Sequence, residues 1–534
     1  MRHHSADSRD SDMAMRAQDC SRSPTDPVPL STSRLPSVSA GAQARSVPLV
    51  RTDAKEAGAY FTPPAVVETL IRWAVRSPGD RLLDPSCGDG RFLAQHGNSV
   101  GVEPHAATVQ AALASAPGAV VHHEDFFSWA ARTADRFDCA AGNPPFIRYQ
   151  RFKGSVRSGA LALCARLGAT FSGLSSSWAP FLVATAGLLK PGGRLAFVVP
   201  AEIGHAPYSA PLIEYLVRRF DRVQIVAFRE KLFPDLSEDC WLLYADGFGG
   251  STSEIRFTAL PRFRPMSTPP RQFVRVPVDE WRGIWQRRLR PFVLADAARA
   301  LYRRASAASW ARRLGDIAAV GIGYVTGDNA FFHLRPSDAE RWRIPAEFLL
   351  PSVRTARALP ADALDEDTVD RWRAADEPIL LLRLPKTRDL PAAVHRYLES
   401  EAGRRAREAY KCRTRDPWFS VPDVQVPDLF LSYMSGVQPN LVANLARCTC
   451  TNAVHSVRLK NGMTAAGLLA LWDQPLVRLS CEIEGHPLGG GMLKLEPGEA
   501  ARVIVPDPHQ AASLDAEVIE EAVRTMRAWR HYDD

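Results

Sequence analysis

The stretch RLLDPSCGDG, residues 81–90, decides the fold. Its apolar start predicts a short buried strand, and Gly88 and Gly90 predict a turn at which the backbone approaches a ligand closely. The run from Gly88 to Leu93 lacks the third glycine of a dinucleotide-binding turn. Asp84 ends the strand with a carboxylate, which repels a phosphate and attracts an ammonium group. We therefore expect a strand–turn–helix unit that binds a cationic ligand.

Six further strands are predicted after this turn. Amphipathic segments separate most of them, and alternating strands and helices are typical of an α/β sheet that is mostly parallel and covered on both faces. The predicted fold class is therefore α/β. The six stretches are 99–104, 119–125, 137–145, 194–203, 221–228 and 240–246.

The regular alternation occupies only part of the chain. Residues 1–50 are rich in Ser, Arg, Asp and Pro, contain no aromatic residue and are predicted to be a disordered tail. Residues 51–250 form the predicted α/β domain, and the Pro-, Ser- and Arg-rich segment 251–275 is interpreted as a linker. Residues 276–534 lose the alternation and are expected to form a mixed α+β domain.

The composition is that of a folded protein with a moderately basic surface. Hydrophobic residues make up 46% and charged residues 23% of the 534 residues, and the formal net charge is +7. Only eight of the 66 basic residues are lysines. Arginine suits phosphate and guanine, but a GC-rich genome also produces this bias, so charge permits a nucleic-acid partner without proving one. The nine cysteines lack zinc-site spacing and no apolar run spans a membrane, so we expect a cytoplasmic protein with reduced thiols and no metal.

Acidic side chains are predicted at the ends of three successive strands. Asp84 and Glu103 end the first and second, and Asp125 ends the third. Ligands of open α/β sheets bind at the carboxyl ends of the strands, so these groups should meet. Asp84 then suits an ammonium group, Glu103 suits ribose hydroxyl groups, and Asp125 suits the amino group of an adenine. The following Phe126 would cover one face of that adenine, so the arrangement favours a cationic nucleoside ligand.

The predicted fourth strand ends in GNPPF, residues 142–146. Pro144 and Pro145 fix the backbone and remove two amide hydrogens. The side-chain oxygen of Asn143 and the carbonyl oxygen of Pro144 can then both accept hydrogen bonds from one target NH2 group. This turns the nitrogen lone pair towards an electrophilic methyl group, and Phe146 would stack on a planar target base. The motif predicts catalysis by positioning rather than by a strong base.

In this order, the motifs resemble those of amino-group DNA methyltransferases of the gamma arrangement, in which cofactor, catalytic and target-recognition regions follow one another. DPSCGDG (84–90) resembles the family's glycine-rich motif, and NPPF (143–146) resembles its catalytic motif with Phe where many members have Tyr. The resemblance is specific over residues 58–246 and looser beyond. It implies a Rossmann-like S-adenosylmethionine-dependent methyltransferase sheet with a C-terminal mixed α+β target-recognition domain. It also implies S-adenosylmethionine as cofactor and methylation of N6 of a flipped adenine in double-stranded DNA.

The resemblance assigns roles to residues outside these two motifs. GAYFTP (58–63) resembles the motif that closes over the methionine end of the cofactor. Phe233, in KLFPD, resembles a later aromatic residue that stacks on the flipped base opposite Phe146. The implied cofactor-binding residues are Tyr60, Thr62, Pro63, Asp84, Pro85, Gly88, Gly90, Glu103, Asp125 and Phe126, and the implied catalytic residues are Asn143, Pro144, Pro145, Phe146 and Phe233.

DNA contacts are predicted in two places. The segment IRYQRFKGSVR (147–157) mixes basic and aromatic side chains and is interpreted as a loop that contacts phosphates and props the displaced base. The domain of residues 276–534 is expected to read the target sequence, with arginines on phosphates or guanines and asparagines on base edges. The candidate DNA-binding residues are Arg148, Arg151, Lys153, Asn329, Arg354, Arg413, Arg415 and Asn452.

Related activities share the catalytic motif. Methylation of protein glutamine or of guanine in RNA usually needs only a small extra domain, whereas a long C-terminal domain is predicted here. Cytosine-N4 methylation more often accompanies Ser in place of Asn143. A catalytically inactive DNA-binding specificity protein would be expected to lose a cofactor or catalytic residue. The favoured hypothesis is the modification enzyme of a restriction–modification system with a separately encoded endonuclease, and an orphan methyltransferase is second.

Overall fold

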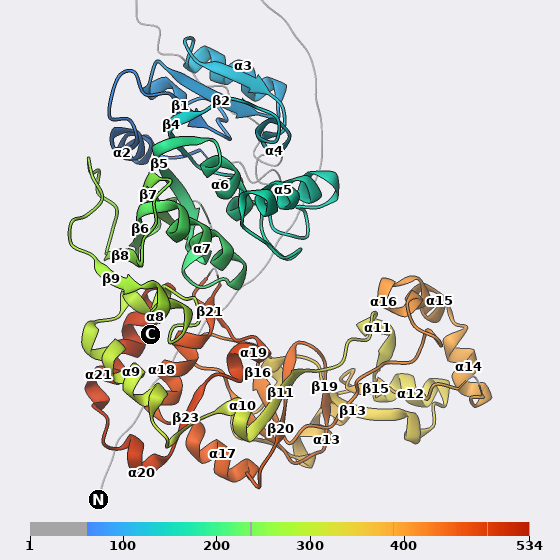
Figure 1. The fold of residues 1–534 in the computed structure, drawn as a ribbon. Coiled ribbons are helices and arrows are strands. Elements are labelled where there is room, and N and C mark those ends of the chain that lie inside the picture. Colours follow the sequence, from blue (N-terminus) through green and yellow to red (C-terminus); the bar gives the residue numbers. More distant parts are fainter. Residues whose placement is uncertain (1–60, 235, 237, 388, 489, 533–534) are drawn as a thin grey trace, which may run out of the picture. The chain divides into compact units, whose positions relative to one another are not determined.

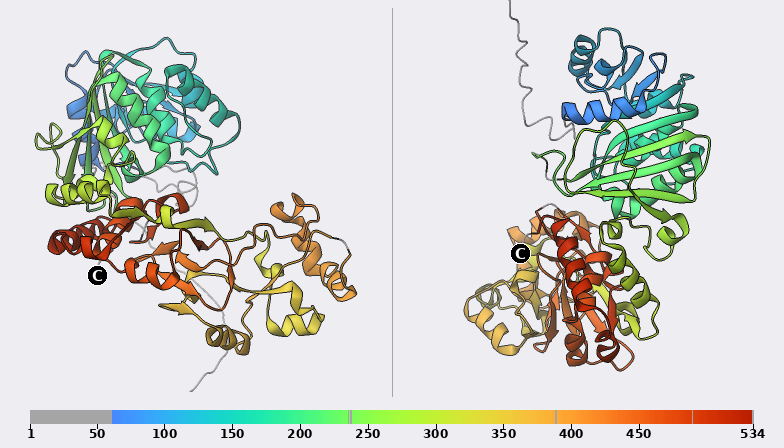
Figure 2. Two further views of the ribbon diagram at one scale, coloured as in Figure 1. Left: turned by 60° about the horizontal axis from the view of Figure 1, so that its bottom comes forward. Right: turned by 90° about the vertical axis from the view of Figure 1, so that its left-hand side faces the viewer.

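The computed structural model describes residues 61–532 except 235, 237, 388 and 489 (Figures 1 and 2). The predicted tail of residues 1–50 and the predicted cofactor residue Tyr60 lie outside the described residues. All described residues belong to the same unit of the chain, Thr52–Asp534. Their eight cysteines are free and buried. None of their helices combines the length and the hydrophobicity that crossing a membrane requires.

A nine-stranded sheet forms the centre of the first half of the described chain (Figure 1). Its order is β3-β2-β1-β4-β5-β7-β6-β8-β9, and all seven predicted strands are present. Strands β1 to β5 pair in parallel, whereas β7 is antiparallel to β5 and β6. The order reverses between β1 and β4, and ligands of such sheets bind at the carboxyl ends beside that reversal. The strands are β1 Leu82–Asp84, β2 Ser99–Glu103, β3 Val120–His123, β4 Phe137–Gly142, β5 Leu189–Pro200, β6 Phe220–Phe228, β7 Cys240–Phe248, β8 Glu254–Leu260 and β9 Val274–Pro277.

Both faces of this sheet are buried, which confirms the predicted fold class. Successive residues of a strand point to opposite faces. Leu195 and Phe197 of β5 pack in one apolar cluster, and Ala196 and Val198 pack in another. Helices α4 to α7 cover the first face and α2 covers the second (Figure 1). These helices and α3 are α2 Pro64–Ala74, α3 Ala106–Ser115, α4 Phe126–Ala130, α5 Gly154–Leu167, α6 Trp178–Ala186 and α7 Ala210–Arg219.

The segment predicted to be a linker, residues 251–275, is instead part of the sheet. Strand β8 runs through it, and β9 begins within it and pairs antiparallel with β8. Ile255 and Phe257 of β8 are fully buried, so the segment contains the alternation of a half-buried strand. The Pro- and Ser-rich composition that suggested a linker belongs to the connection between the two strands. The sheet therefore ends at Pro277.

The second half contains four smaller sheets within the described residues, with orders β10-β23, β11-β20-β16-β18-β14, β12-β15-β13-β19 and β17-β22-β21. Their strands are β10 Ala311–Arg313, β11 Ala318–Ile322, β12 His333–Leu334, β13 Leu349–Val353, β14 Ala363–Leu364, β15 Leu380–Leu382, β16 Leu429–Ser432, β17 Met434–Ser435, β18 Leu441–Asn444, β19 Thr449–Cys450, β20 Val454–Leu459, β21 His486–Pro487, β22 Leu493–Lys494 and β23 Ile504–Pro506. The helices are α8 Val278–Arg282, α9 Asp296–Ala307, α10 Leu314–Ile317, α11 Asn329–Phe332, α12 Pro336–Trp342, α13 Glu366–Ala374, α14 Ala392–Leu398, α15 Glu401–Glu408, α16 Tyr410–Arg413, α17 Ala465–Trp472, α18 Pro475–Glu484, α19 Pro497–Ala500, α20 Pro508–Ala511 and α21 Ala516–Ala528. This mixed content agrees with the predicted α+β character.

Helices from the second half share an apolar core with the sheet. Residues of α9, α18 and α21 belong to the same buried cluster as β5 and β8. Polar contacts reinforce this connection, because the amide of Leu289 donates to the carbonyl oxygen of Gly204 at 2.7 Å and Nε2 of His531 lies 2.9 Å from a carboxylate oxygen of Asp239. Within the second half, Arg288 forms a buried ion pair with Glu484 at 2.5 Å, and removing one partner would leave an uncompensated charge. The C-terminal end of the chain is thus fastened to the sheet.

Candidate active site

The glycine-rich turn after β1 has the backbone that the sequence predicts. Gly88 and Gly90 adopt left-handed φ angles of 52° and 81°. A Cβ atom on Gly90 would lie 2.8 Å from the Cα atom of Ala112 in α3, so this position also requires glycine for packing. The amide of Cys87 donates to the carbonyl oxygen of Val102, at 3.1 Å, and ties the turn to β2. The turn therefore has a fixed path beside the carboxyl ends of β1 and β2.

Two carboxylates are buried at these strand ends. Asp84 is 1% exposed and Glu103 is 7% exposed. The pKa of Asp84 is raised from 3.8 to about 8, chiefly by burial and in smaller part by the charges of Glu103 and Asp89. Burial also raises the pKa of Glu103. A bound cation would stabilise both charged forms, so the pair fits a cationic ligand.

Asp125 and Phe126, predicted to hold an adenine ring, begin α4. One oxygen of Asp125 accepts from the backbone amide and the hydroxyl group of Ser128, both at 2.9 Å, and caps the helix. Phe126 is 3% exposed and packs against Phe181 with ring centroids 4.4 Å apart. Its ring is thus part of the core, because α4 turns it towards α6. Its contact with an adenine stays a prediction.

The catalytic loop leaves β4 in direct contact with the glycine-rich turn. The hydroxyl group of Ser86 donates to the carbonyl oxygen of Asn143 at 3.1 Å. A Cβ atom on Gly142 would lie 2.7 Å from a carboxylate oxygen of Asp84, so glycine is needed for this approach. The carbonyl oxygen of Pro144 accepts no hydrogen bond from a described residue. The structure thus brings together the two motifs that the sequence separates.

Ser177, at the start of α6, holds the other end of this loop. Its hydroxyl group donates to the carbonyl oxygen of Pro145 at 2.5 Å and accepts from the amide of Ile147 at 3.0 Å. Its own amide donates to the carbonyl oxygen of Ile147 at 2.9 Å. Sequence reasoning missed Ser177 and Ser86, although Ser86 lies inside the quoted motif and Ser177 precedes an apolar helix.

The two predicted stacking aromatics lie in one apolar cluster. Phe233 is 6% exposed and packs with Leu232 and Leu236, and the half-buried Phe146 packs against the same cluster. Lys231 donates to the carbonyl oxygen of Leu236 at 2.8 Å and holds this turn. The stacking of Phe146 and Phe233 on a base stays a prediction.

Arg91 connects the described end of the GAYFTP motif to the glycine-rich turn. Its guanidinium group donates to both carboxylate oxygens of Asp89, at 2.9 and 2.6 Å, and to the carbonyl oxygen of Thr62 at 2.6 Å. It also lies over the exposed ring of Phe61, 4.7 Å from the centroid. Thr62 is buried and Pro63 is the N-cap residue of α2. Arg91, which the sequence analysis did not select, therefore positions two cofactor motifs.

The predicted DNA-binding residues fall into exposed and anchored groups. Arg415 is anchored, because it donates to the backbone oxygens of Thr326 and Val325 at 2.5 and 2.6 Å. Asn329 accepts from the hydroxyl group of Thr326 at 2.6 Å. Arg148 is 71% exposed and forms an ion pair with Glu238 at 2.8 Å. Arg151, Lys153, Arg413 and Asn452 are exposed and Arg354 is half-buried.

Three family models match the chain. The N-6 DNA Methylase model matches residues 48–113, the Eco57I restriction-modification methylase model matches 107–233, and the model of the C-terminal domain of Type II methyltransferase M.Eco57I matches 286–533. The first two cover the turn, the strand ends and the catalytic loop. The third covers most of the second half.

Two similar proteins are both named Type II methyltransferases. Type II methyltransferase M.XamI of Xanthomonas campestris pv. amaranthicola is 25% identical over 474 residues, which are 85% of this chain and 86% of that protein. Type II methyltransferase M.AccI of Acinetobacter calcoaceticus is 18% identical over 74% of this chain and 73% of its own length. Among solved structures, the DrdV–DNA complex matches 80% of this chain and 54% of that chain, with a TM-score of 0.44 and 12% identity.

Proposed function

This chain is an adenine-N6 DNA methyltransferase of the restriction–modification type, and on that basis we propose that the carboxyl ends of β1 to β4 form its active site. The gamma arrangement of its regions stays a prediction. The observation that carries the proposal is the hydrogen bond from Ser86 to the carbonyl oxygen of Asn143, because it joins the cofactor turn to the catalytic loop.

The family and fold imply S-adenosylmethionine as the cofactor, which supplies an electrophilic methyl group. The buried carboxylates fit its positive charge. Asp84, whose pKa burial raises to about 8, would bind the ammonium group and become fully ionised beside it. Glu103 would accept from the ribose hydroxyl groups. Asp125 uses one oxygen as a helix cap, which leaves its other oxygen for the adenine amino group.

The catalytic loop acts on the target amine by orientation. Asn143 and the carbonyl oxygen of Pro144 would accept its two hydrogens, so that the nitrogen lone pair points at the methyl group. Ser86 and Ser177 fix the loop at both ends. Phe146 and Phe233 would stack on the displaced adenine, and this stacking would offset part of the cost of flipping, about a few kcal/mol.

The second half of the chain is proposed to recognise the target sequence. The sheets between β11 and β20 lie in the region that the Type II methyltransferase C-terminal model matches, and exposed arginines are available there for phosphate contacts. A separately encoded restriction endonuclease is proposed as the functional partner, since relatives are Type II methyltransferases by name.

The test is methyl transfer from labelled S-adenosylmethionine to mixed-sequence duplex DNA, followed by nucleoside mass spectrometry. Wild-type protein should form N6-methyladenine. Asn143→Ala should form none and should still bind the cofactor in calorimetry, because Asn143 is assigned to the target amine alone. Loss of cofactor binding in this variant, or full activity, would contradict the proposed role. Methylated cytosine would retain the loop mechanism and reject adenine as the target.

A further inference from the structure

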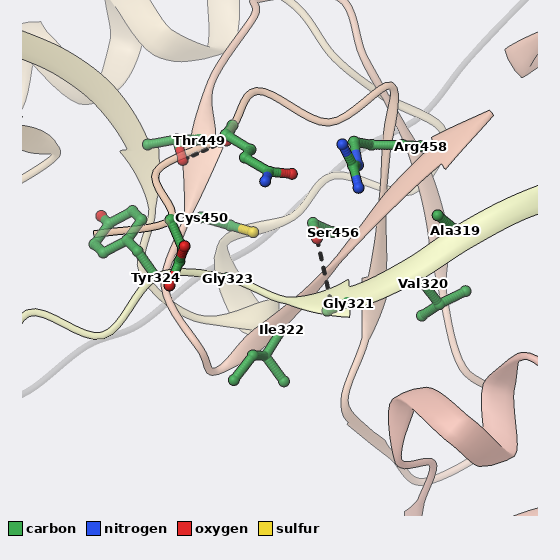
Figure 3. Close-up of a pocket in the computed structure, with 12 residues that line it drawn as sticks. Ala319, Val320, Gly321, Ile322, Gly323, Tyr324, Thr449, Cys450, Ser456 and Arg458 are labelled. Atoms are coloured by element: carbon green, nitrogen blue, oxygen red, sulfur yellow. Dashed lines mark hydrogen bonds between the residues drawn. The ribbon is translucent and has the colours of Figure 1, made fainter. Parts of the chain in front are cut away.

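A cavity of about 200 Å³ lies in the second half, between β11, β20 and the segment before β16 (Figure 3). Its floor consists of small side chains on one face of two paired strands, because Gly321 of β11 lies opposite Ser456 of β20. The hydroxyl group of Ser456 donates to the carbonyl oxygen of Gly321 at 3.3 Å. In Figure 3, Arg458 stands beside Ser456, whereas Ile322 points away. The small floor leaves room that a larger side chain would fill.

Three polar side chains surround this floor. Arg458 comes from β20, and Asp423 and Gln425 come from the segment before β16. Val424, between the last two, packs against an apolar cluster, whereas Asp423 and Gln425 line the cavity. All three polar side chains are exposed, and none forms a side-chain hydrogen bond or an ion pair with another described residue. The cavity thus carries donors and acceptors that the fold does not use.

The backbone around the cavity is held firmly. The hydroxyl group of Thr449 donates to the carbonyl oxygen of Gln425 at 2.7 Å. A Cβ atom on Gly323 would lie 2.1 Å from the carbonyl oxygen of Cys450, so the two segments touch through a glycine. Asp423 has a left-handed φ of 58°, a conformation that is uncommon for a residue other than glycine and is often found at binding sites. The backbone that carries Asp423 and Gln425 is therefore held in place beside the cavity.

The chemistry of the cavity narrows its ligand. Its volume is below the roughly 300–1,000 Å³ of most small-molecule sites. The carboxylate of Asp423 repels a phosphate group, which argues against a contact with the DNA backbone alone. The guanidinium group of Arg458 and the carboxylate of Asp423 together match the major-groove edge of a G·C pair. That edge offers two acceptors on guanine and a donor on cytosine.

We propose that this cavity reads one G·C base pair of the recognition sequence. Arg458 donates to guanine O6 and N7, and Asp423 accepts from the N4 amino group of the paired cytosine. Gln425, at the same cavity, offers a further hydrogen-bonding group. The inference rests on the proposed function of the second half, and it makes Arg458 and Asp423 determinants of sequence specificity.

The test uses the full chain and the recognition sequence obtained by sequencing its methylated product. Each guanine is replaced in turn by 7-deazaguanine, which lacks the N7 acceptor. Wild-type kcat/KM should fall roughly tenfold at one guanine. Arg458→Ala should be slower by a similar factor on the normal duplex and insensitive to the replacement at that position. Arg312→Ala, which changes an exposed strand arginine of β10 outside the cavity, should behave as wild type.

Two further variants separate base reading from other effects. Gly321→Val fills the floor without changing charge, and its nearest non-neighbour atom, the hydroxyl oxygen of Ser456, is 3.3 Å from the new Cβ. It should abolish the same position-specific effect and leave cofactor affinity, which reports on the folded catalytic domain, unchanged. Asp423→Asn should relax selection of cytosine in the same pair.

The results that overturn the inference are equally specific. A recognition sequence without a G·C pair, undiminished sensitivity to 7-deazaguanine in Arg458→Ala, or an equal loss on every duplex would each reject it. A wild-type protein that methylates no adenine contradicts the proposed function instead. Binding of duplexes selected from a random pool by the wild-type protein, measured by fluorescence anisotropy with and without 7-deazaguanine, then tests the cavity independently of methylation.

Discussion

The carboxyl edge of the nine-stranded sheet and the cavity of the second half bring their polar groups together in different ways. At the sheet edge, the acids and the catalytic loop follow the carboxyl ends of parallel strands that pair in the order β3-β2-β1-β4, so all of them lie along one edge of the sheet. At the cavity, Gly321 and Ser456 meet across antiparallel strands although they are 135 positions apart. The first kind of site is visible as a motif, and the second becomes visible only in the fold.

The largest expected effect is the loss of methylation when Asn143 is replaced. It tests whether the motif at the sheet edge is the catalytic site. Asn143→Ala should lower the methylation rate by at least about a hundredfold, because the target amine loses an acceptor that sets its orientation. Single-turnover kinetics with saturating cofactor measure this directly. A rate within tenfold of wild type would show that the visible motif is not where the chemistry occurs.

A second prediction concerns the buried acid that begins the sheet-edge site. Asp84→Asn should weaken cofactor binding more than tenfold, since a neutral amide cannot balance an ammonium group. The same variant should stabilise the cofactor-free protein. The pKa of Asp84 is raised from 3.8 to about 8, so between these pH values the folded protein retains a proton that the unfolded chain has released. Stability therefore falls as pH rises through this interval, by on the order of a few kcal/mol.

Urea unfolding of both proteins at pH 5 and pH 8 checks this sign. The stability difference in favour of Asp84→Asn should be larger at pH 8. A difference that is equal at the two pH values would show that Asp84 ionises normally in the folded protein.

The third prediction asks whether the contacts that the sequence analysis missed matter. Ser177→Ala removes the hydroxyl group that bonds to Pro145 and Ile147 and should lower kcat about tenfold while leaving cofactor affinity unchanged. Ser175→Ala is the matched control, because the buried hydroxyl group of Ser175 has no hydrogen-bond partner among the described residues. Equal kcat values for the two variants would remove Ser177 from the catalytic arrangement.

The smallest expected effects concern two arginines of the second half, of which one is exposed and the other is hydrogen-bonded to the backbone. Arg413→Ala should weaken DNA binding a fewfold and reduce its salt slope by about one, as loss of one phosphate contact does. Arg415→Ala should instead lower the melting temperature, because its guanidinium group bonds to Val325 and Thr326. Titrations at several salt concentrations and thermal unfolding distinguish the two arginines. If Arg413→Ala lowered the melting temperature and Arg415→Ala reduced the salt slope, the roles assigned to the two arginines would be wrong.

The sequence predicted the sheet well because its evidence is local. Each strand is an apolar run, and Asp84 or Glu103 stands at the end of its own strand. Strand β8 was missed because the prolines and serines that follow it dominated the composition of the segment, although Ile255 and Phe257 alternate with polar residues. Ser177 was missed because its role depends on a contact with a loop 32 positions away.

The second half was predicted only as a fold class and a set of candidate residues. Arg415 and Arg458 are both arginines among many, and nothing adjacent to either in the chain shows that one bonds to the backbone and the other lines a cavity. That difference depends on which strands pair. Parallel strands connected by helices place all their carboxyl ends at one edge of the sheet, so residues at strand ends can be expected to meet, whereas long-range antiparallel pairing brings together residues that no local pattern connects.

The shared core of the sheet and the C-terminal helices determines where this protein can be recombined with a relative. A chimera that exchanged everything after Pro277 would cut through this common apolar cluster. No described residue from β11 to α17 belongs to the cluster, which continues at Leu476 of α18. An exchange limited to residues 318–472 would carry the cavity to a new host and leave the catalytic scaffold whole.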